Sequence, residues 1–231
     1  MTSEAEIHSI DAVLLDMDGT ILNSIATAER IWGRWAAGQG LDVDAFLKTI
    51  HGVQSVETIR RLGLPGVDPV TEAARITQAE IDDVDGIEAI AGSAAFLSSL
   101  PGAQWAVVTS APRALAQRRI AAAGLPNPPI LIAAEDVEHG KPAPDCFLLA
   151  ARQLGTTAER CLVLEDSAAG ILAAERAGAL VLVITATHTH TVETPHPAIR
   201  DYSALQVEAA DDGELWIRPD GASQSYRLRT G

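Results

Sequence analysis

The stretch Ala12-Val13-Leu14-Leu15-Asp16-Met17-Asp18-Gly19-Thr20 decides how this chain of 231 residues folds. Its four leading apolar residues show no alternation, which is typical of a strand covered on both faces of a parallel sheet. The strand runs directly into Asp16 and Asp18, and Gly19 permits a tight turn after them. Ligands of open α/β sheets bind outside the carboxyl ends of the strands. The stretch therefore predicts a buried strand that places both aspartates at a binding crevice.

Further apolar runs and the helical stretches between them predict the rest of the sheet. Three runs are also short, apolar and without alternation, and a fourth is weaker: Trp105–Val108, Cys161–Leu164, Leu180–Ile184 and Ile130–Ala133. Helical stretches lie at Pro112–Ala123, Pro144–Leu154 and Ala168–Ala177. Strands that alternate with helices of this length indicate an α/β fold with a doubly wound, Rossmann-like parallel sheet.

About ninety residues between the first strand and the second contain no good strand. Ala28, Ile31, Trp32 and Trp35 keep the spacing of an amphipathic helix. Further helical patterns lie near Val43–Ile50, Val56–Leu62 and Pro69–Ile81. We predict a helical domain over 23–91, inserted into a core formed by 1–22 and 92–231. The alternative, helices that simply pack onto the sheet, is disfavoured because strand-to-helix crossovers are normally far shorter.

The composition and the chain ends exclude several classes of protein. A net charge of −14 disfavours nucleic acid and anionic membranes as partners. Cys146 and Cys161 belong to no zinc pattern, Met1–His8 has no secretory features, and no apolar run is long enough to span a membrane. We expect a cytoplasmic protein, monomeric or weakly dimeric. Leu205–Glu208 and Leu215–Arg218 are interpreted as edge strands of a structural C-terminal segment, followed by a turn at Pro219-Asp220-Gly221.

Acidic residues follow two of the predicted strands. Glu165 and Asp166 come directly after Cys161–Leu164, so four carboxylates meet at the edge that Asp16 and Asp18 occupy. Two like charges about 4 Å apart repel by ~4 kcal/mol at an effective dielectric constant near 20. Alone, Asp-Gly could be a solvated turn and Glu-Asp a helix start, but the shared edge disfavours both explanations. Mg²⁺, a hard cation that prefers oxygen ligands, is the expected counter-ion.

Cationic and hydroxyl groups are predicted at the same edge. Lys141 lies in a Gly-Lys-Pro loop that follows the weaker strand candidate, where it could neutralise a phosphate and a nucleophile. Thr109 and Ser110 follow Trp105–Val108 and precede a helix, and helix N-termini favour anions. The pattern indicates a phosphate-binding crevice.

These motifs in this order resemble the haloacid dehalogenase-like superfamily of phosphatases, and the likeness extends over essentially the whole chain. The resemblance implies that Asp16 attacks phosphorus and that Asp18 protonates the leaving alcohol. It implies a metal site for Mg²⁺ that is formed by Asp16, the carbonyl of Asp18, Asp166 and Glu165. It also implies a set of phosphoryl-binding residues, formed by Thr109, Ser110 and Lys141. The helical insertion resembles the α-helical cap of that superfamily.

Within the superfamily, the layout is similar to sugar phosphatases and to glycerol-phosphate and deoxyglucose-phosphate phosphatases. The loop with His51, Gly52 and Gln54 is then expected to touch the sugar; alternatively, His51 only ends a helix. The alternative of a hexose-phosphate mutase of the β-phosphoglucomutase type is disfavoured, because Ser55 stands where an arginine would hold a second phosphate. The alternative of a catalytically inactive sugar-phosphate sensor is disfavoured, because Asp16 and the other positions of the catalytic motifs are intact.

Overall fold

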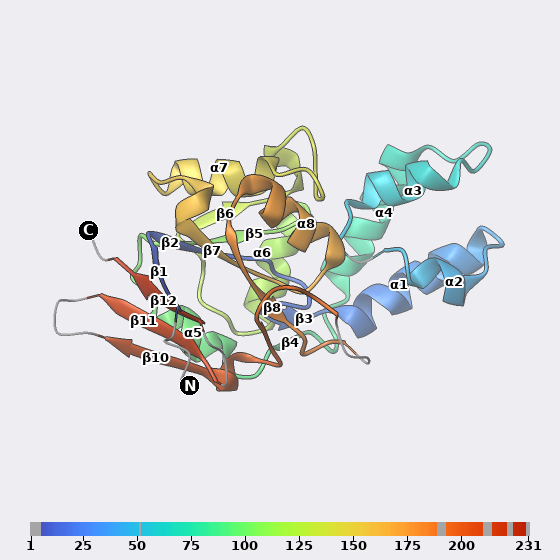
Figure 1. The fold of residues 1–231 in the computed structure, drawn as a ribbon. Helices are drawn as coiled ribbons and strands as arrows, with labels where there is room; N and C mark the ends of the chain where they lie inside the picture. Colours follow the sequence, from blue (N-terminus) through green and yellow to red (C-terminus); the bar gives the residue numbers. More distant parts are fainter. Residues whose placement is uncertain (1–5, 51, 189–192, 210–213, 221–223, 230–231) are drawn as a thin grey trace.

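The main sheet has six parallel strands (Figure 1). The computed structural model describes residues 6–50, 52–188, 193–209, 214–220 and 224–229. In chain order the strands are β2 (Ala12–Leu15), β5 (Trp105–Val108), β6 (Ile130–Ile132), β7 (Cys161–Glu165), β8 (Leu180–Ile184) and β9 (Ala198–Ile199). Their order across the sheet is β6-β5-β2-β7-β8-β9, and every neighbouring pair is parallel. The predicted strands are confirmed, and β9 is added at the edge.

Helices cover both faces of this sheet, as a doubly wound fold requires. Side chains of β2 alternate: Ala12 and Leu14 join one apolar cluster, whereas Val13 and Leu15 join the other. The first cluster includes residues of α7 (Asp145–Gln153) and α8 (Ala168–Ala177). The second includes residues of α5 (Ser93–Ser99) and α6 (Arg113–Ala122). Because each fully buried aliphatic side chain contributes about 1.5–3 kcal/mol, these two clusters hold the strand ends in place.

The predicted helical insertion is present as four helices beside the sheet (Figure 1). They are α1 (Ile25–Gly38), α2 (Val43–Leu47), α3 (Ser55–Leu62) and α4 (Pro69–Asp82). These helices share an apolar cluster of their own, which includes Trp32, Phe46, Ile59 and Ile76. Two short antiparallel strands, β3 (Leu22–Asn23) and β4 (Glu88–Ala89), join the insertion to the core.

One helix of the insertion is shorter than its sequence pattern predicts. The pattern predicts a helix as far as Ile50, but α2 ends at Leu47. The backbone N–H and the hydroxyl of Thr49 both donate to the Phe46 carbonyl, at 2.8 and 2.7 Å. These bonds tighten the last turn, and the chain leaves the helix axis with Ile50 still buried in the cluster.

The two chain ends form a second sheet that the sequence analysis did not predict. Its strands are β1 (Glu6–Ile10), β10 (Leu205–Ala209), β11 (Leu215–Pro219) and β12 (Gln224–Leu228), in the order β1-β12-β11-β10. β10 is at an edge as expected, but β11 is an inner strand, because β12 and the parallel β1 continue the sheet beyond it. Gly221 of the predicted turn lies outside the described residues. Ile217 and Tyr226 join the main core.

Candidate active site

The carboxyl ends of three neighbouring strands carry the predicted polar residues. Asp16 follows β2, Thr109 follows β5, and Glu165 ends β7 with Asp166 next to it. The strands β5, β2 and β7 are adjacent in the sheet, so these side chains lie at one edge. The backbone fixes Asp16 further, because its N–H donates to the Leu164 carbonyl at 3.0 Å. The fold thus brings together residues nearly 150 positions apart.

A buried lysine connects two of these carboxylates. Lys141 Nζ donates to Asp16 Oδ1 at 2.5 Å and to Glu165 Oε1 at 2.8 Å, and also to the Val108 carbonyl at 3.1 Å. Burial alone would lower the pKa of Lys141, but Asp16 and Glu165 outweigh it and raise this pKa well above its ordinary value. The ammonium group is therefore a fixed positive charge beside Asp16.

The acidic cluster needs more positive charge than Lys141 supplies. Ligand oxygens of Asp16, Glu165 and Asp166 all lie within 4.8 Å of one another. Burial raises the pKa of Asp16 to about 7, and the charge of Glu165 adds to this rise, against the opposing effect of Lys141. Burial and the charges of Glu165 and Asp16 raise the pKa of Asp166 well above its ordinary value. A bound cation would reverse both shifts, so the cluster fits a divalent metal that prefers oxygen.

Glu165 has little capacity left to bind a metal directly. Its Oε1 accepts from Lys141, and its Oε2 accepts from the backbone N–H groups of Asp166 and Ser167 at 2.8 Å each. The Ser167 hydroxyl donates to the same oxygen. Glu165 is fully buried, and a Cβ on Gly170 would come within 1.5 Å of its Oε1. Its carboxylate therefore orients Lys141 and the turn that carries Asp166.

Asp18 points its side chain away from the acidic cluster. Its Oδ1 accepts from Ser24 Oγ at 2.5 Å and from Arg119 Nη1 at 2.9 Å. The chain turns at Gly19, which has φ +88°, and a Cβ there would collide with Asp166 at 2.0 Å. Both of these bonds reach Oδ1, so Asp18 Oδ2 has no hydrogen-bond partner among the described residues and is open to a ligand in the cavity.

Thr109 and Ser110 lie at the same cavity but differ in their available donors. Thr109 Oγ1 accepts from the Ala111 N–H at 3.0 Å, which leaves its hydroxyl proton for a phosphoryl oxygen. The Ser110 hydroxyl donates to the Gly52 carbonyl at 3.1 Å. Ser110 was expected to offer its hydroxyl and its backbone N–H to phosphate; in this structure the hydroxyl fastens the helical insertion to the core, and the residue still lines the cavity.

A cavity opens over these residues. Its lining shares polar residues of the strand ends with apolar residues of α1 and its neighbours: Asp16, Asp18, Ser24, Ala28, Trp32, Ile50, Gly52, Val53, Ser55, Glu80, Thr109, Ser110, Ala111, Pro112, Leu115 and Arg119. The helical insertion therefore supplies one wall and the sheet edge supplies the floor.

The loop expected to touch the sugar is only partly in this cavity. His51 lies outside the described residues. Gly52 lines the cavity at φ +74°, and a Cβ there would meet Ser167 Oγ at 2.7 Å. Gln54 does not line it within the described part of the chain; its Nε2 donates to the Ala134 carbonyl at 3.1 Å. Gln54 thus holds the loop against the core.

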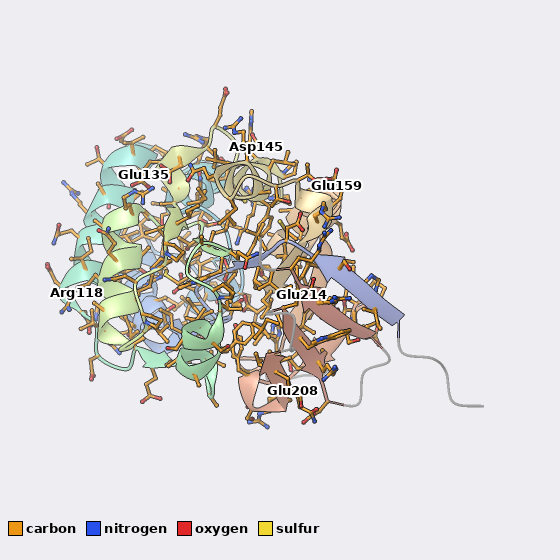
Figure 2. The ribbon with its side chains drawn as sticks, turned by 90° about the vertical axis from the view of Figure 1, so that its left-hand side faces the viewer. Arg118, Glu135, Asp145, Glu159, Glu208 and Glu214 are labelled. Carbon is orange, nitrogen blue, oxygen red and sulfur yellow. The ribbon has the colours of Figure 1, made fainter. Side chains whose placement is uncertain are left out.

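Sequence reasoning missed Glu80 and Arg119, two charged residues of the cavity wall. Arg119 shares the buried side of α6 with Leu115, Ala116 and Ile120, whereas its neighbour Arg118 reaches the surface (Figure 2). Glu80 shares the buried side of α4 with Ala73 and Ile76. The signal was available, because a charged residue at a buried helical position needs a partner or a function.

Comparisons with known proteins agree with this geometry. A family model described as haloacid dehalogenase-like hydrolase matches residues 10–178, most of the chain. The chain belongs to this family of hydrolases. The matched region includes the main-sheet strands β2 to β7 and the helical insertion, and it ends before β8.

Two curated relatives of this haloacid dehalogenase-like hydrolase are phosphatases of Escherichia coli (strain K12). Hexitol phosphatase A is 39% identical over 177 residues, which cover 75% of this chain and 82% of the relative. Fructose-1-phosphate phosphatase YqaB is 32% identical over 176 residues, with coverages of 72% and 92%.

Solved structures agree on the fold. A haloacid dehalogenase hydrolase from Entamoeba histolytica has a TM-score of 0.70 at 23% identity, covering 85% of this chain and 96% of its own. A β-phosphoglucomutase from Clostridium difficile has a TM-score of 0.68 at 20% identity, covering 76% and 84%.

Proposed function

We propose that this hydrolase is a Mg²⁺-dependent phosphatase of small sugar or polyol monophosphates, acting through an aspartyl-phosphate intermediate. One observation carries the proposal: buried Lys141 holds the Asp16 carboxylate at the floor of a cavity, beside a cluster of acidic groups that requires a cation. A carboxylate fixed in this way is suited to attack phosphorus, because phosphoryl transfer depends mainly on positioning and charge neutralisation.

Asp16 and Asp18 divide the chemistry between them. An Asp16 oxygen bonds to phosphorus while the bond between phosphorus and the leaving oxygen breaks, and Asp18 Oδ2 gives its proton to that oxygen. Asp18 then takes a proton from water, which attacks the phosphorus and releases phosphate and Asp16. Ser24 and Arg119 hold Asp18 in this orientation through Oδ1.

Asp16, Asp166 and the main-chain carbonyl of Asp18 would hold the Mg²⁺ ion. Thr20 Oγ1 donates to Asp166 Oδ1 at 3.3 Å and so orients this carboxylate. When bound, Mg²⁺ supplies positive charge that neutralises the phosphoryl oxygens. Lys141 supplies the second positive charge on the side of Glu165.

The helical insertion, residues 23–91 by our proposal, is a cap that closes over the substrate. It has its own apolar cluster, and the two-residue strands β3 and β4 connect it to the core. Contacts from Gly52 to Ser110 and from Gln54 to Ala134 fasten it to the core in a closed arrangement. Closure of this kind excludes water during transfer.

Relatives support a sugar or polyol phosphate as substrate, since their names specify hexitol and fructose 1-phosphate. A mutase must bind a second phosphate, but Arg119 is the one cation among the described lining residues and is already paired with two carboxylates. A catalytically dead sensor would not need the paired Asp16 and Asp18.

A phosphate-release assay over a panel of hexitol, fructose and glycerol phosphates tests the proposal. We expect turnover with Mg²⁺ and none in excess chelator, and poor replacement by Ca²⁺, whose larger, looser coordination misplaces the phosphoryl group. Full activity in chelator would remove the metal from the account. Interconversion of phosphohexoses without phosphate release would identify a mutase.

A further inference from the structure

Glu80 and Arg119 are buried charged residues of the cavity that take no direct part in phosphoryl transfer. Glu80 comes from α4 in the helical insertion, and Arg119 comes from α6 in the core. Only 3% of Glu80 and 5% of Arg119 is exposed. Burial of charged groups is costly, and apolar side chains of similar size often replace such pairs without loss of stability. Stability alone therefore gives no reason for this pair at the cavity wall.

The pair keeps unused hydrogen-bonding capacity. Arg119 Nη2 donates to Glu80 Oε1 at 2.8 Å, and Nη1 donates to Asp18 Oδ1. A guanidinium group carries five N–H donors, and Arg119 Nε is buried without a partner among the described residues. A carboxylate has about four acceptor sites, and Arg119 and the side chain of Trp32 fill only part of them at Glu80. Donors and acceptors thus lie side by side, which suits a hydroxyl group because it both donates and accepts.

Part of this wall is apolar. Trp32, Ile50 and Leu115 line the cavity together with the pair. Such side chains can pack against the carbon chain of a substrate and exclude water, and the one polar group among them, the indole N–H of Trp32, is directed to Glu80. Glu80 and Arg119 are therefore the charged groups that this wall offers to the hydroxyl groups of the leaving group.

The charges of the cavity disfavour a second anion. Among the described lining residues, Asp16, Asp18 and Glu80 are carboxylates and Arg119 is the one cation. Lys141 and the metal cluster serve the transferred phosphoryl group. On the leaving-group side, the single charge of Arg119 faces both Asp18 and Glu80. Even when Asp18 carries the proton that it gives to the leaving oxygen, Glu80 balances the charge of Arg119, so a carboxylate or phosphate on the leaving group would find no unpaired positive charge there.

We propose that Glu80 and Arg119 form a leaving-group subsite that selects phosphate esters of uncharged polyols and rejects esters with a second anionic group. The subsite binds a leaving-group hydroxyl between the Glu80 carboxylate and the Arg119 guanidinium. This inference rests on the proposed phosphatase activity and specifies its substrate class. Arg119 also positions Asp18, so it joins hydroxyl recognition to proton transfer.

A matched pair of substrates tests the subsite in the wild-type protein. Glycerol 3-phosphate and 3-phosphoglycerate differ only in a terminal CH₂OH group against a carboxylate. We expect kcat/KM to favour glycerol 3-phosphate by about a hundredfold, because the carboxylate is repelled by Glu80 and cannot donate a hydrogen bond to it. p-Nitrophenyl phosphate, which has no hydroxyl group, reports phosphoryl transfer separately.

Glu80→Gln removes the negative charge and keeps the size of the side chain. We expect the preference for glycerol 3-phosphate to fall about tenfold, chiefly through a higher KM for this ester. Glu72→Gln is the matched control on the same helix, since Glu72 bonds to Trp35 and Arg75 and does not line the cavity. Thermal unfolding verifies that both variants are folded.

Arg119→Lys keeps the charge but cannot bridge Asp18 and Glu80 with a planar fork. We expect a higher KM for glycerol 3-phosphate and also a lower kcat, with Arg118→Lys on the exposed side of α6 as control. This variant and the wild-type ratio decide the question even if Glu80→Gln does not fold.

Two results would overturn the inference alone: a wild-type protein that hydrolyses both esters equally well, or a folded Glu80→Gln variant with an unchanged ratio. Hydrolysis of p-nitrophenyl phosphate without turnover of any polyol phosphate would overturn the proposed function, and this inference with it.

Discussion

At the scale of the residue, each of the two aspartates that we propose as catalytic is held by its own buried cation. Lys141 holds Asp16 from beneath, and Arg119 holds Asp18 from the cavity wall. The two aspartates are only two positions apart, yet these cations direct their side chains into different surroundings. In the mechanism that we propose, this separation lets one carboxylate act as nucleophile while the other transfers protons.

Asp18→Asn should separate the two halves of the reaction. p-Nitrophenolate leaves without needing a proton, whereas the second half still needs a base to activate water. We therefore expect a burst of about one nitrophenolate per protein followed by turnover slowed about 10²–10⁴-fold. Rapid-mixing absorbance measurements reveal the burst. Steady release at the wild-type rate would show that Asp18 moves no proton.

At the scale of the element, the loop between α2 and α3 fastens the helical insertion to the core. Gln54 donates to the Ala134 carbonyl, and it packs so closely on Gly140 that a Cβ there would lie 2.9 Å from the Gln54 amide group. From the resemblance to sugar phosphatases, this loop is expected to touch the sugar. In the structure Gln54 bonds to the core, and by our proposal this contact stabilises closure of the cap without depending on the substrate.

Gln54→Ala should accordingly lower kcat/KM by about fivefold, the loss that corresponds to one hydrogen bond of ~1 kcal/mol. Because closure is weakened, the loss should be the same for sorbitol 6-phosphate and for p-nitrophenyl phosphate. Steady-state kinetics with both substrates provide the measurement, and Gln117→Ala on the exposed side of α6 is the control. A loss confined to sorbitol 6-phosphate would place Gln54 on the substrate.

Elements with strong local patterns could be predicted from the sequence, and those formed by distant pairing could not. β2 and β5 were predicted to the residue because continuous apolar runs mark buried parallel strands. β1 pairs with β12 from the other end of the chain, and neither segment has enough apolar residues to reveal that partner. The position of Lys141 was predicted from its loop, but its bond to Glu165 depends on the fold.

At the scale of the whole molecule, the core places negative charge where only a cation can balance it. The chain is strongly acidic, with a net charge of −14, and labelled residues such as Glu135, Glu159 and Glu208 extend to the periphery in Figure 2. No helix in the described part of the chain has the length and apolar character to cross a membrane. At the sheet edge, Asp16, Glu165 and Asp166 bring negative charge together in one cluster, and a divalent cation bound there would stabilise the fold.

Mg²⁺ should raise the unfolding temperature of the protein without any substrate. At a Mg²⁺ concentration of about a hundred times Kd, binding stabilises the native state by ~2.7 kcal/mol. For a chain of this size, each kcal/mol raises Tm by about 2–4 °C. Differential scanning fluorimetry should show this shift in the wild type and lose it in Asp166→Asn. An equal shift in both proteins would place the metal elsewhere.

The central claim is that Asp16 carries the phosphoryl group during the reaction, and trapping this intermediate tests it most directly. Asp18→Asn, in which hydrolysis of the intermediate is slow, is mixed with p-nitrophenyl phosphate, quenched in acid, digested and analysed by mass spectrometry. We predict one added phosphoryl group on Asp16, and neither this group nor turnover in Asp16→Asn, which should remain folded. A phosphoryl group on another side chain, or activity of Asp16→Asn within about tenfold of wild type, would contradict the account.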